Sequence, residues 1–149
     1  GFGVTGCVWL NCLSEQGFAI SLKDLPFIGQ TGYSEFHHSL ATANLMESCV
    51  FADGWKAVNR QDWSSGAGHT ATQNVFWNVK GPSKVFSKQF GWGYVIGTSP
   101  ATDVTTTVGG WLNVEGEGTE PVDWVEGEGE GSTLYPQSLF DHQFEMRTL

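Results

Sequence analysis

The chain has 149 residues, with 16 acidic and 7 basic side chains, and its formal net charge is −9. This length suits one domain with a core, and 40% hydrophobic with 15% charged residues is typical of a folded protein. The acidic balance argues against nucleic acid and against anionic membrane surfaces as partners, because both bind clustered Lys and Arg. No apolar run approaches the length of a transmembrane helix.

A two-part pattern recurs along the first hundred residues. The first part is a short apolar run, seen at Val8–Cys12, Leu45–Cys49 and Val75–Val79. The second part follows a glycine or proline, at Phe18–Leu22, Trp55–Asn59 and Ser83–Ser87. Repeated strand–turn–strand units are typical of a solenoid, in which each coil buries its apolar face against its neighbours. We therefore predict stacked β-coils over residues 1–110.

Superposing the three apolar runs aligns their last two positions in columns. Asn11, Ser48 and Asn78 form one column, and we predict that they form a ladder of stacked amides that satisfies buried polar groups. Cys12 and Cys49 share the next column with Val79. Two small buried thiols are favoured over a disulfide, because adjacent strands seldom offer disulfide geometry, but the sequence leaves their bonding open.

Three further segments interrupt or follow the coils. Residues 24–33 contain Pro26 and repeated glycines, which predict a loop on one face of the solenoid. Residues 111–133 are rich in Glu and Gly and predict a solvated, mobile acidic segment. Residues 134–149 predict a short helix that caps the last coil. Together these parts make one structural domain. Its uncapped start predicts that the chain is part of a longer protein, or a mature form whose leader and earlier coils are absent.

Several segments resemble a known superfamily. His37–Ala41, Gly66–His69, Gln73–Asn78 and Pro136–Phe140 are similar to the C-terminal portion of carbohydrate-active proteins with the pectin-lyase-like fold. The resemblance covers most of the chain from residue 37 onward and implies an all-β, right-handed parallel β-helix. It also implies an extracellular protein, secreted or at the cell surface, whose partner is a polysaccharide. Lyases, hydrolases, epimerases and non-catalytic fibres share this fold, so the resemblance leaves the activity open.

Candidate catalytic side chains lie between the second and third coils. A lyase needs a base and a cation that neutralises a uronate, whereas a hydrolase needs paired carboxylates. Arg60 would supply the cation, Asp62 a carboxylate, and His69 a titrating group on a glycine-rich turn. Alternatively, Arg60 is an ordinary solvated residue and His69 bonds to the backbone of its turn.

Candidate substrate-binding side chains are polar or aromatic: Gln73, Lys88, Trp55, Trp63 and Trp92. The tryptophans would offer a flat face to a sugar ring, although large aromatic residues are more often buried in a core. Lys56 and Lys84 lie on or beside the same second strands as Lys88 and would face the same surface. We predict no cofactor; the Glu–Gly segment leaves Ca²⁺ open but lacks the ligand spacing of known calcium loops.

Two functions follow from these observations. The first is polysaccharide binding across the coils, with or without cleavage of the glycan. The second is a non-catalytic structural or adhesive solenoid that self-associates through the exposed edges of its coils, because an open strand edge pairs readily with another. The polar residues from 59 to 74 favour the first function, and the lack of a recognisable acid–base pair favours the second.

Overall fold

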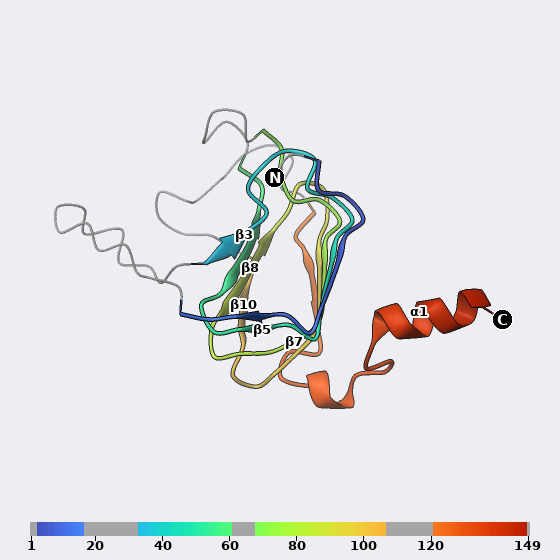
Figure 1. Ribbon diagram of the computed structural model, residues 1–149. Coiled ribbons are helices and arrows are strands. Elements are labelled where there is room, and N and C mark those ends of the chain that lie inside the picture. The colour runs from blue at the N-terminus through green and yellow to red at the C-terminus, as the bar shows by residue number, and fades with distance from the viewer. Residues whose placement is uncertain (1–2, 17–32, 61–67, 107–120, 149) are drawn as a thin grey trace.

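The chain folds as a parallel β-solenoid. The computed structural model describes residues 3–16, 33–60, 68–106 and 121–148. Figure 1 shows the chain winding through stacked coils, with one α-helix at the C-terminal end. Every pair of described strands is parallel, so the predicted β-solenoid is confirmed. No helix in the described part of the chain is both long and apolar enough to cross a membrane.

The strands form three sheets that follow the sides of the coils. The first sheet has the order β1 (Val8–Leu10), β4 (Leu45–Glu47), β7 (Val75–Val79), β9 (Tyr94–Thr98), β11 (Trp124–Glu126). The second has the order β10 (Asp103–Thr105), β8 (Lys84–Lys88), β6 (Trp55–Val58), β3 (Ser34–Glu35). The third pairs β2 (Leu13–Ser14) with β5 (Val50–Phe51). The sequence pattern predicted the first two sides of the coil and missed the third.

The structure describes two of the three predicted second strands. Strands β6 and β8 lie where the second and third copies predicted them. The first copy, at residues 18–22, lies outside the described residues. Strand β3 pairs with β6 and thus takes the position of a second strand in the first coil. On the first sheet, β1 pairs with β4 among the described strands. Self-association through the other edge of β1 stays a prediction.

Apolar side chains of successive coils stack in the interior. On the first sheet Met46, Phe76 and Val95 are fully buried, because every second residue of a strand faces inward. Trp9 and Val125 continue this row at either end and are partly buried. Other sides of the coils contribute Ala57, Val85, Phe51 and Cys49 to the same core. Burial of this continuous core is the main term that stabilises the solenoid.

The column that contains Asn11, Ser48 and Asn78 is a backbone corner. These three residues have φ angles of 52°, 51° and 50°, in the left-handed region. In the next two coils Gly97 and Gly127 hold the same position, with φ angles of 69° and 66°. Asparagine and glycine are the residues that tolerate this conformation best. The amide-ladder prediction is wrong here: the Asn78 amide instead donates to Oε1 of Gln137, at 3.0 Å.

A ladder of buried polar side chains runs along a different corner. Asn44 Nδ2 donates to Asn74 Oδ1 at 2.8 Å, and Asn74 Nδ2 donates to Gln89 Oε1 at 3.0 Å. The Gln89 backbone N–H then donates to Oδ2 of Asp123 at 3.0 Å. All four residues are buried. This polar ladder, Asn44–Asn74–Gln89–Asp123, links four successive coils.

The third rung of the polar ladder is supplied from outside the column. Asn44, Asn74 and Asp123 each directly precede a strand of the first sheet, but the equivalent residue in the fourth coil is Gly93. A Cβ atom on Gly93 would lie 1.9 Å from Nε2 of Gln89. The side chain of Gln89 therefore occupies the space that an asparagine at position 93 would fill.

The Glu–Gly segment contributes to the coils instead of remaining solvated throughout. Residues 107–120 lie outside the described residues, but Trp124–Glu126 forms β11 and pairs with β9. Asp123 is only 6% exposed and accepts hydrogen bonds from Ser87 Oγ, Gln89 N and Gly93 N. The prediction of a solvated, mobile segment is thus wrong for residues 123–126, which join the first sheet. Hydrogen bonds to the buried Asp123 and the packing of Val125 against the core hold this part in place, whereas Val122 and Trp124 stay exposed.

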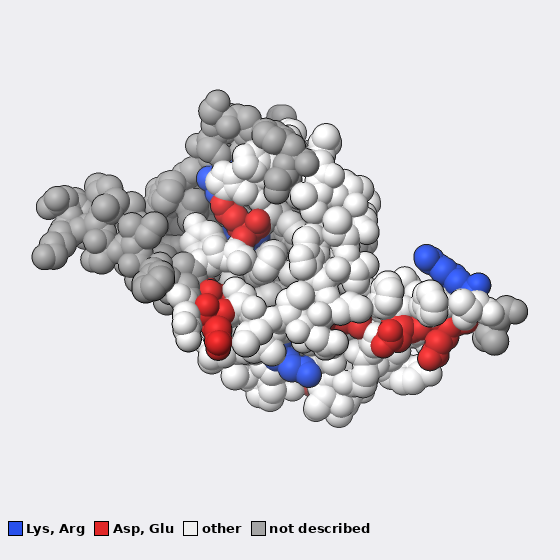
Figure 2. Space-filling view, in the orientation of Figure 1, with Lys and Arg blue, Asp and Glu red and all other residues white. Residues whose placement is uncertain are grey.

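The predicted C-terminal helix is confirmed, but it does not lie over the last coil. Helix α1 (Leu139–Thr148) has no buried residue and projects from the stack in Figure 1. Its Phe140 N–H donates to Glu47 Oε2 at 2.9 Å, which attaches it to β4, inside the first sheet. Before the helix, η2 (Gly131–Thr133) is followed by Pro136, whose carbonyl accepts from Trp77 Nε1 at 3.1 Å. Figure 2 shows acidic side chains along this projecting segment.

Candidate functional site

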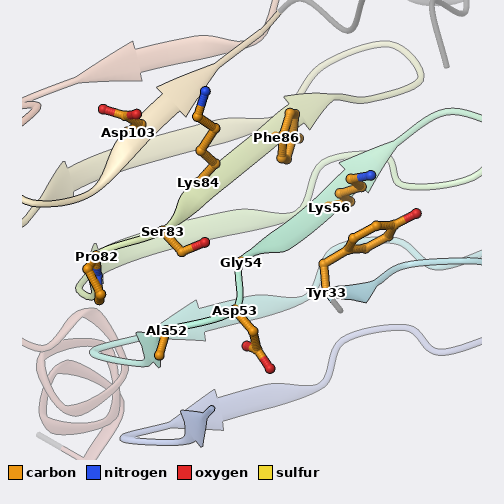
Figure 3. A pocket seen from close by; sticks show the side chains of 10 residues that line it. All are labelled: Tyr33, Ala52, Asp53, Gly54, Lys56, Pro82, Ser83, Lys84, Phe86 and Asp103. Atoms are coloured by element: carbon orange, nitrogen blue, oxygen red, sulfur yellow. The ribbon is translucent and has the colours of Figure 1, made fainter. Parts of the chain in front are cut away.

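A groove of about 470 Å³ opens on the outer face of the second sheet. It lies toward the beginnings of β6, β8 and β10 and is closed at one side by Tyr33, which precedes β3. Figure 3 shows the side chains that line it, and the ones that bear on its chemistry are Tyr33, Asp53, Lys56, Lys84, Phe86 and Asp103. We call it the Lys56 groove.

Strand alternation places these side chains on the outer face. Ala57 and Val85 face the core, so their neighbours Lys56 and Phe86 face outward. Parallel register then aligns Lys56 with Phe86 on the adjacent strand. The same register aligns Lys84 with Asp103 on β10, and both of these side chains are exposed. The groove thus combines two aromatic rings with cationic and anionic side chains from neighbouring coils.

Lys56 is the most unusual residue of the groove, because it is only 3% exposed. Its Nζ lies 3.3 Å from the centroid of the Tyr33 ring and 5.1 Å from that of Phe86. A cation over an aromatic face is attracted by the negative π surface of the ring. Burial lowers the pKa of Lys56 to about 8, with the nearby Glu35 opposing this shift and Arg60 adding to it. Burial, with a further contribution from Glu35, also raises the pKa of Tyr33.

Arg60 and Glu35 form an ion pair beside the groove. Nη1 of Arg60 lies 3.1 Å from Oε2 of Glu35, and both side chains are largely shielded from solvent. Nδ1 of His37 contacts the other oxygen of the same carboxylate. The Arg60 backbone N–H donates to Thr70 Oγ1 at 3.0 Å. Arg60, predicted to meet a uronate, is therefore already engaged with a carboxylate of its own chain.

Other predicted residues gather at the opposite end of the same sheet. The His69 ring stacks on Phe90, with centroids 4.3 Å apart, and its Nδ1 lies 3.3 Å from Nδ2 of Asn59. Gln73 and Trp92 are exposed, and the Gln73 N–H donates to the Trp92 carbonyl at 2.6 Å. His69, Gln73 and Trp92 therefore lie around one corner, beyond the strand ends and away from the Lys56 groove.

Four predicted site residues remain. Lys88 ends β8 opposite Val58 and is partly exposed. Trp55 was expected to face a sugar, but its ring lies 5.6 Å from Phe36 and 5.2 Å from Phe51 and packs against the core. Trp55 is partly buried and is not among the residues that line the Lys56 groove, so a role for it in sugar binding stays a prediction. Asp62 and Trp63 lie outside the described residues.

The sequence reasoning missed the aromatic part of the groove. Tyr33 stands at the end of a predicted loop, and Phe86 was read as one residue of a strand. Alternation within Lys84–Lys88 was the available signal, because it places Phe86 on the face opposite Val85. Contact between Tyr33 and Lys56 joins residues that are far apart in the sequence, and no local pattern specifies such a contact.

Neither a metal-binding cluster nor a similar protein narrows the choice of function further. Among the described residues, no group of three or more His, Cys, Asp or Glu side chains is placed to hold a metal ion. Comparisons of the chain with family models, curated proteins and solved structures find no match. The functional argument therefore depends on the geometry and chemistry of the groove.

Proposed function

We propose that the Lys56 groove binds an acidic polysaccharide. The observation that carries this proposal is a lysine, 3% exposed, held between two aromatic rings in a groove on a sheet face. The exposed Lys84 places a second cation in the same groove, and cationic side chains form strong, charge-assisted hydrogen bonds with anionic groups of a ligand. The similarity of the coil pattern to pectin-lyase-like β-helices also supports a glycan ligand and an extracellular location.

The two kinds of side chain in the groove match the two faces of a uronic acid unit. The rings of Tyr33 and Phe86 offer apolar faces to the C–H groups of a pyranose. Lys56 and the exposed Lys84 would bind the carboxylates, as charge-assisted hydrogen bonds are stronger than neutral ones. Because the whole chain carries a net charge of −9, general electrostatic attraction would not bring an acidic polymer to it, and binding must come from these local cations.

Substitution of Lys84 tests the proposal directly. We expect Lys84→Ala to weaken the affinity for polygalacturonate about 2- to 5-fold, the effect of one exposed ion pair. Lys80→Ala is the matched control, because Lys80 is also exposed but is not among the residues that line the groove. Carboxyl-reduced polygalacturonate should bind weakly to every variant. Equal loss in both lysine variants, or equal binding of the reduced polymer, would contradict the proposal.

The pH dependence of binding tests the role of Lys56. Below a pKa of about 8 the amine is protonated and attracts a carboxylate, and above it the amine is neutral. Uronates are ionised throughout this range, so affinity should fall between about pH 7 and about pH 9. Lys56→Met should bind more weakly at the lower pH and lose this step, as measured by calorimetry. A separate measurement on the same samples tests for cleavage. A lyase reaction would leave an unsaturated product, which absorbs ultraviolet light, so a rise in absorbance would show that the bound polymer is also cleaved.

A further inference from the structure

Two cysteines of neighbouring coils lie directly side by side. Cys12 and Cys49 follow the corner residues Asn11 and Ser48, at equivalent positions of the first and second coils. Backbone hydrogen bonds flank the pair: Asn11 N donates to Glu47 O at 3.0 Å, and Val50 N donates to Cys12 O at 2.8 Å. These bonds hold the two backbones one strand spacing apart, about 4.8 Å. This separation falls inside the Cα–Cα range of disulfides, about 4.4–6.8 Å.

The two thiols differ in exposure, in a way that favours stepwise oxidation. Cys49 is fully buried, and its Sγ lies 3.3 Å from the carbonyl oxygens of Trp9 and of Glu47. Burial raises the pKa of Cys49 to about 11, and a hydrogen bond with the Cys12 thiol contributes to this shift. Cys12 is exposed, which contradicts the expectation of two buried thiols. A reagent from solution therefore meets Cys12 first, with Cys49 directly behind it.

We propose that Cys12 and Cys49 are a disulfide-forming pair that ties the first coil to the second. The oxidant is a small-molecule disulfide, as found in oxidising compartments. The Cys12 thiolate attacks one sulfur of this disulfide, whose S–S bond breaks and releases one small thiolate. Cys49 then loses its proton to water and attacks Cys12 Sγ, which expels the second small thiolate. Two protein thiols are oxidised, and one small disulfide is reduced to two thiols.

The link acts at the open end of the described stack. Strands β1 and β2 of the first coil each pair with one strand, β4 and β5, among the described residues. A covalent bond between positions 12 and 49 closes the chain segment between these two positions. Closing such a segment restricts the unfolded chain and stabilises the folded one. Among the described core residues, Trp9 of the first coil is only partly buried, whereas Met46 of the second coil is fully buried. We therefore expect the first coil to gain most from the link.

Cys7 provides an internal control for the assignment. It is an exposed free cysteine like Cys12, but it lies at the other end of β1, next to Asn44. Incubating the purified chain with oxidised glutathione should remove two hydrogen atoms from the intact mass of the wild type and of Cys7→Ser. Peptide mapping should place the link between positions 12 and 49. Cys12→Ser should not form the link, and Cys12 is exposed, so this variant is expected to fold normally.

Thermal unfolding adds a second measurement. The oxidised wild type should unfold at a higher temperature than the reduced protein, and a reductant should reverse the difference. Cys12→Ser should show no such shift, whereas Cys7→Ser should keep it. A stable glutathione adduct on Cys12 without closure would overturn the proposal. A disulfide that involves Cys7 would overturn it equally. So would the finding that, after oxidation of the folded chain, an alkylating reagent added in unfolding buffer still modifies both Cys12 and Cys49.

Discussion

A single glycine decides how the polar ladder passes through the fourth coil. Gly93 leaves the space that the Gln89 side chain fills, and Gln89 in turn accepts hydrogen bonds from the backbone and side chain of Asn74. An alanine at position 93 would place its Cβ within 1.9 Å of Gln89 Nε2 and force that side chain out. We expect Gly93→Ala to lower the free energy of unfolding by about 1–3 kcal/mol, as overpacking and a lost buried hydrogen bond both contribute. Urea denaturation measures the change.

A paired substitution is the control for this prediction. Gln89→Ala alone leaves Asn74 without an acceptor for two donors, and Gly93→Asn alone should clash with Gln89. Combining Gln89→Ala with Gly93→Asn restores an asparagine in the column, beside Asn74. The double variant should therefore be more stable than either single one. If Gly93→Asn alone is as stable as the wild type, Gln89 does not fill this space.

At the residue scale, the sequence predicted the columns better than their chemistry. Superposition correctly aligned Asn11, Ser48 and Asn78, but asparagine serves both amide ladders and left-handed corners. The identity of the residue alone did not distinguish these two roles. The polar ladder escaped notice because its third rung comes from Gln89, four positions before the column residue Gly93. A rung supplied from outside its column leaves no periodic signal.

At the scale of the strands, the left-handed corner gives a test of the coil geometry. Ser48 has a φ angle of 51°, which costs a residue with a side chain about 1–2 kcal/mol relative to ordinary backbone. Glycine removes this cost but makes the unfolded chain more flexible, which offsets about 0.4–1 kcal/mol. We therefore expect Ser48→Gly to stabilise the protein by about 0.5–1 kcal/mol, measured by thermal unfolding.

Two further substitutions are controls for this prediction: glycine in place of a serine outside the corner, and a bulkier residue at the corner itself. Ser83 directly precedes β8 and is not among the residues with positive φ, so Ser83→Gly should destabilise slightly. Ser48→Val should destabilise strongly, since β-branched residues fit the left-handed region poorly. Equal effects of glycine at positions 48 and 83 would mean that the corner is not strained.

Where the amino-acid composition of a segment and its pattern of apolar residues predicted different structures, the pattern gave the correct one. The runs that became β7 and β8 carry alternating buried and outward residues, which specify strands directly. The Glu–Gly segment suggested a solvated linker, yet Trp124 and Val125 within it continue the first sheet as β11. The short apolar step after Asp123 was the available signal. The Lys56 groove was less predictable, because Tyr33 reaches it from a segment whose path depends on tertiary contacts.

For the molecule as a whole, the described strands follow the stacking that the repeat predicted, with a third sheet, β2–β5, added in the first two coils. Helix α1 shows the limit of this reasoning. Its sequence predicted a helix but not its position, since no residue of α1 is buried and its attachment is through Glu47. An element that makes few contacts leaves few sequence constraints on where it lies.

The unequal spacing of the coils along the chain has a consequence for how the protein folds. Val75 pairs with Tyr94, the closest pairing in sequence on the first sheet, whereas Val8 must find Leu45 across the longest interval. The entropy cost of closing a loop grows with its length, so β7 and β9 should join first and β1 last. Val95→Ala should therefore slow refolding, while Trp9→Leu should mainly speed unfolding, in stopped-flow kinetics. The reverse result would place the folding nucleus at the N-terminal coil, and the solenoid would then assemble in chain order instead of outward from its middle.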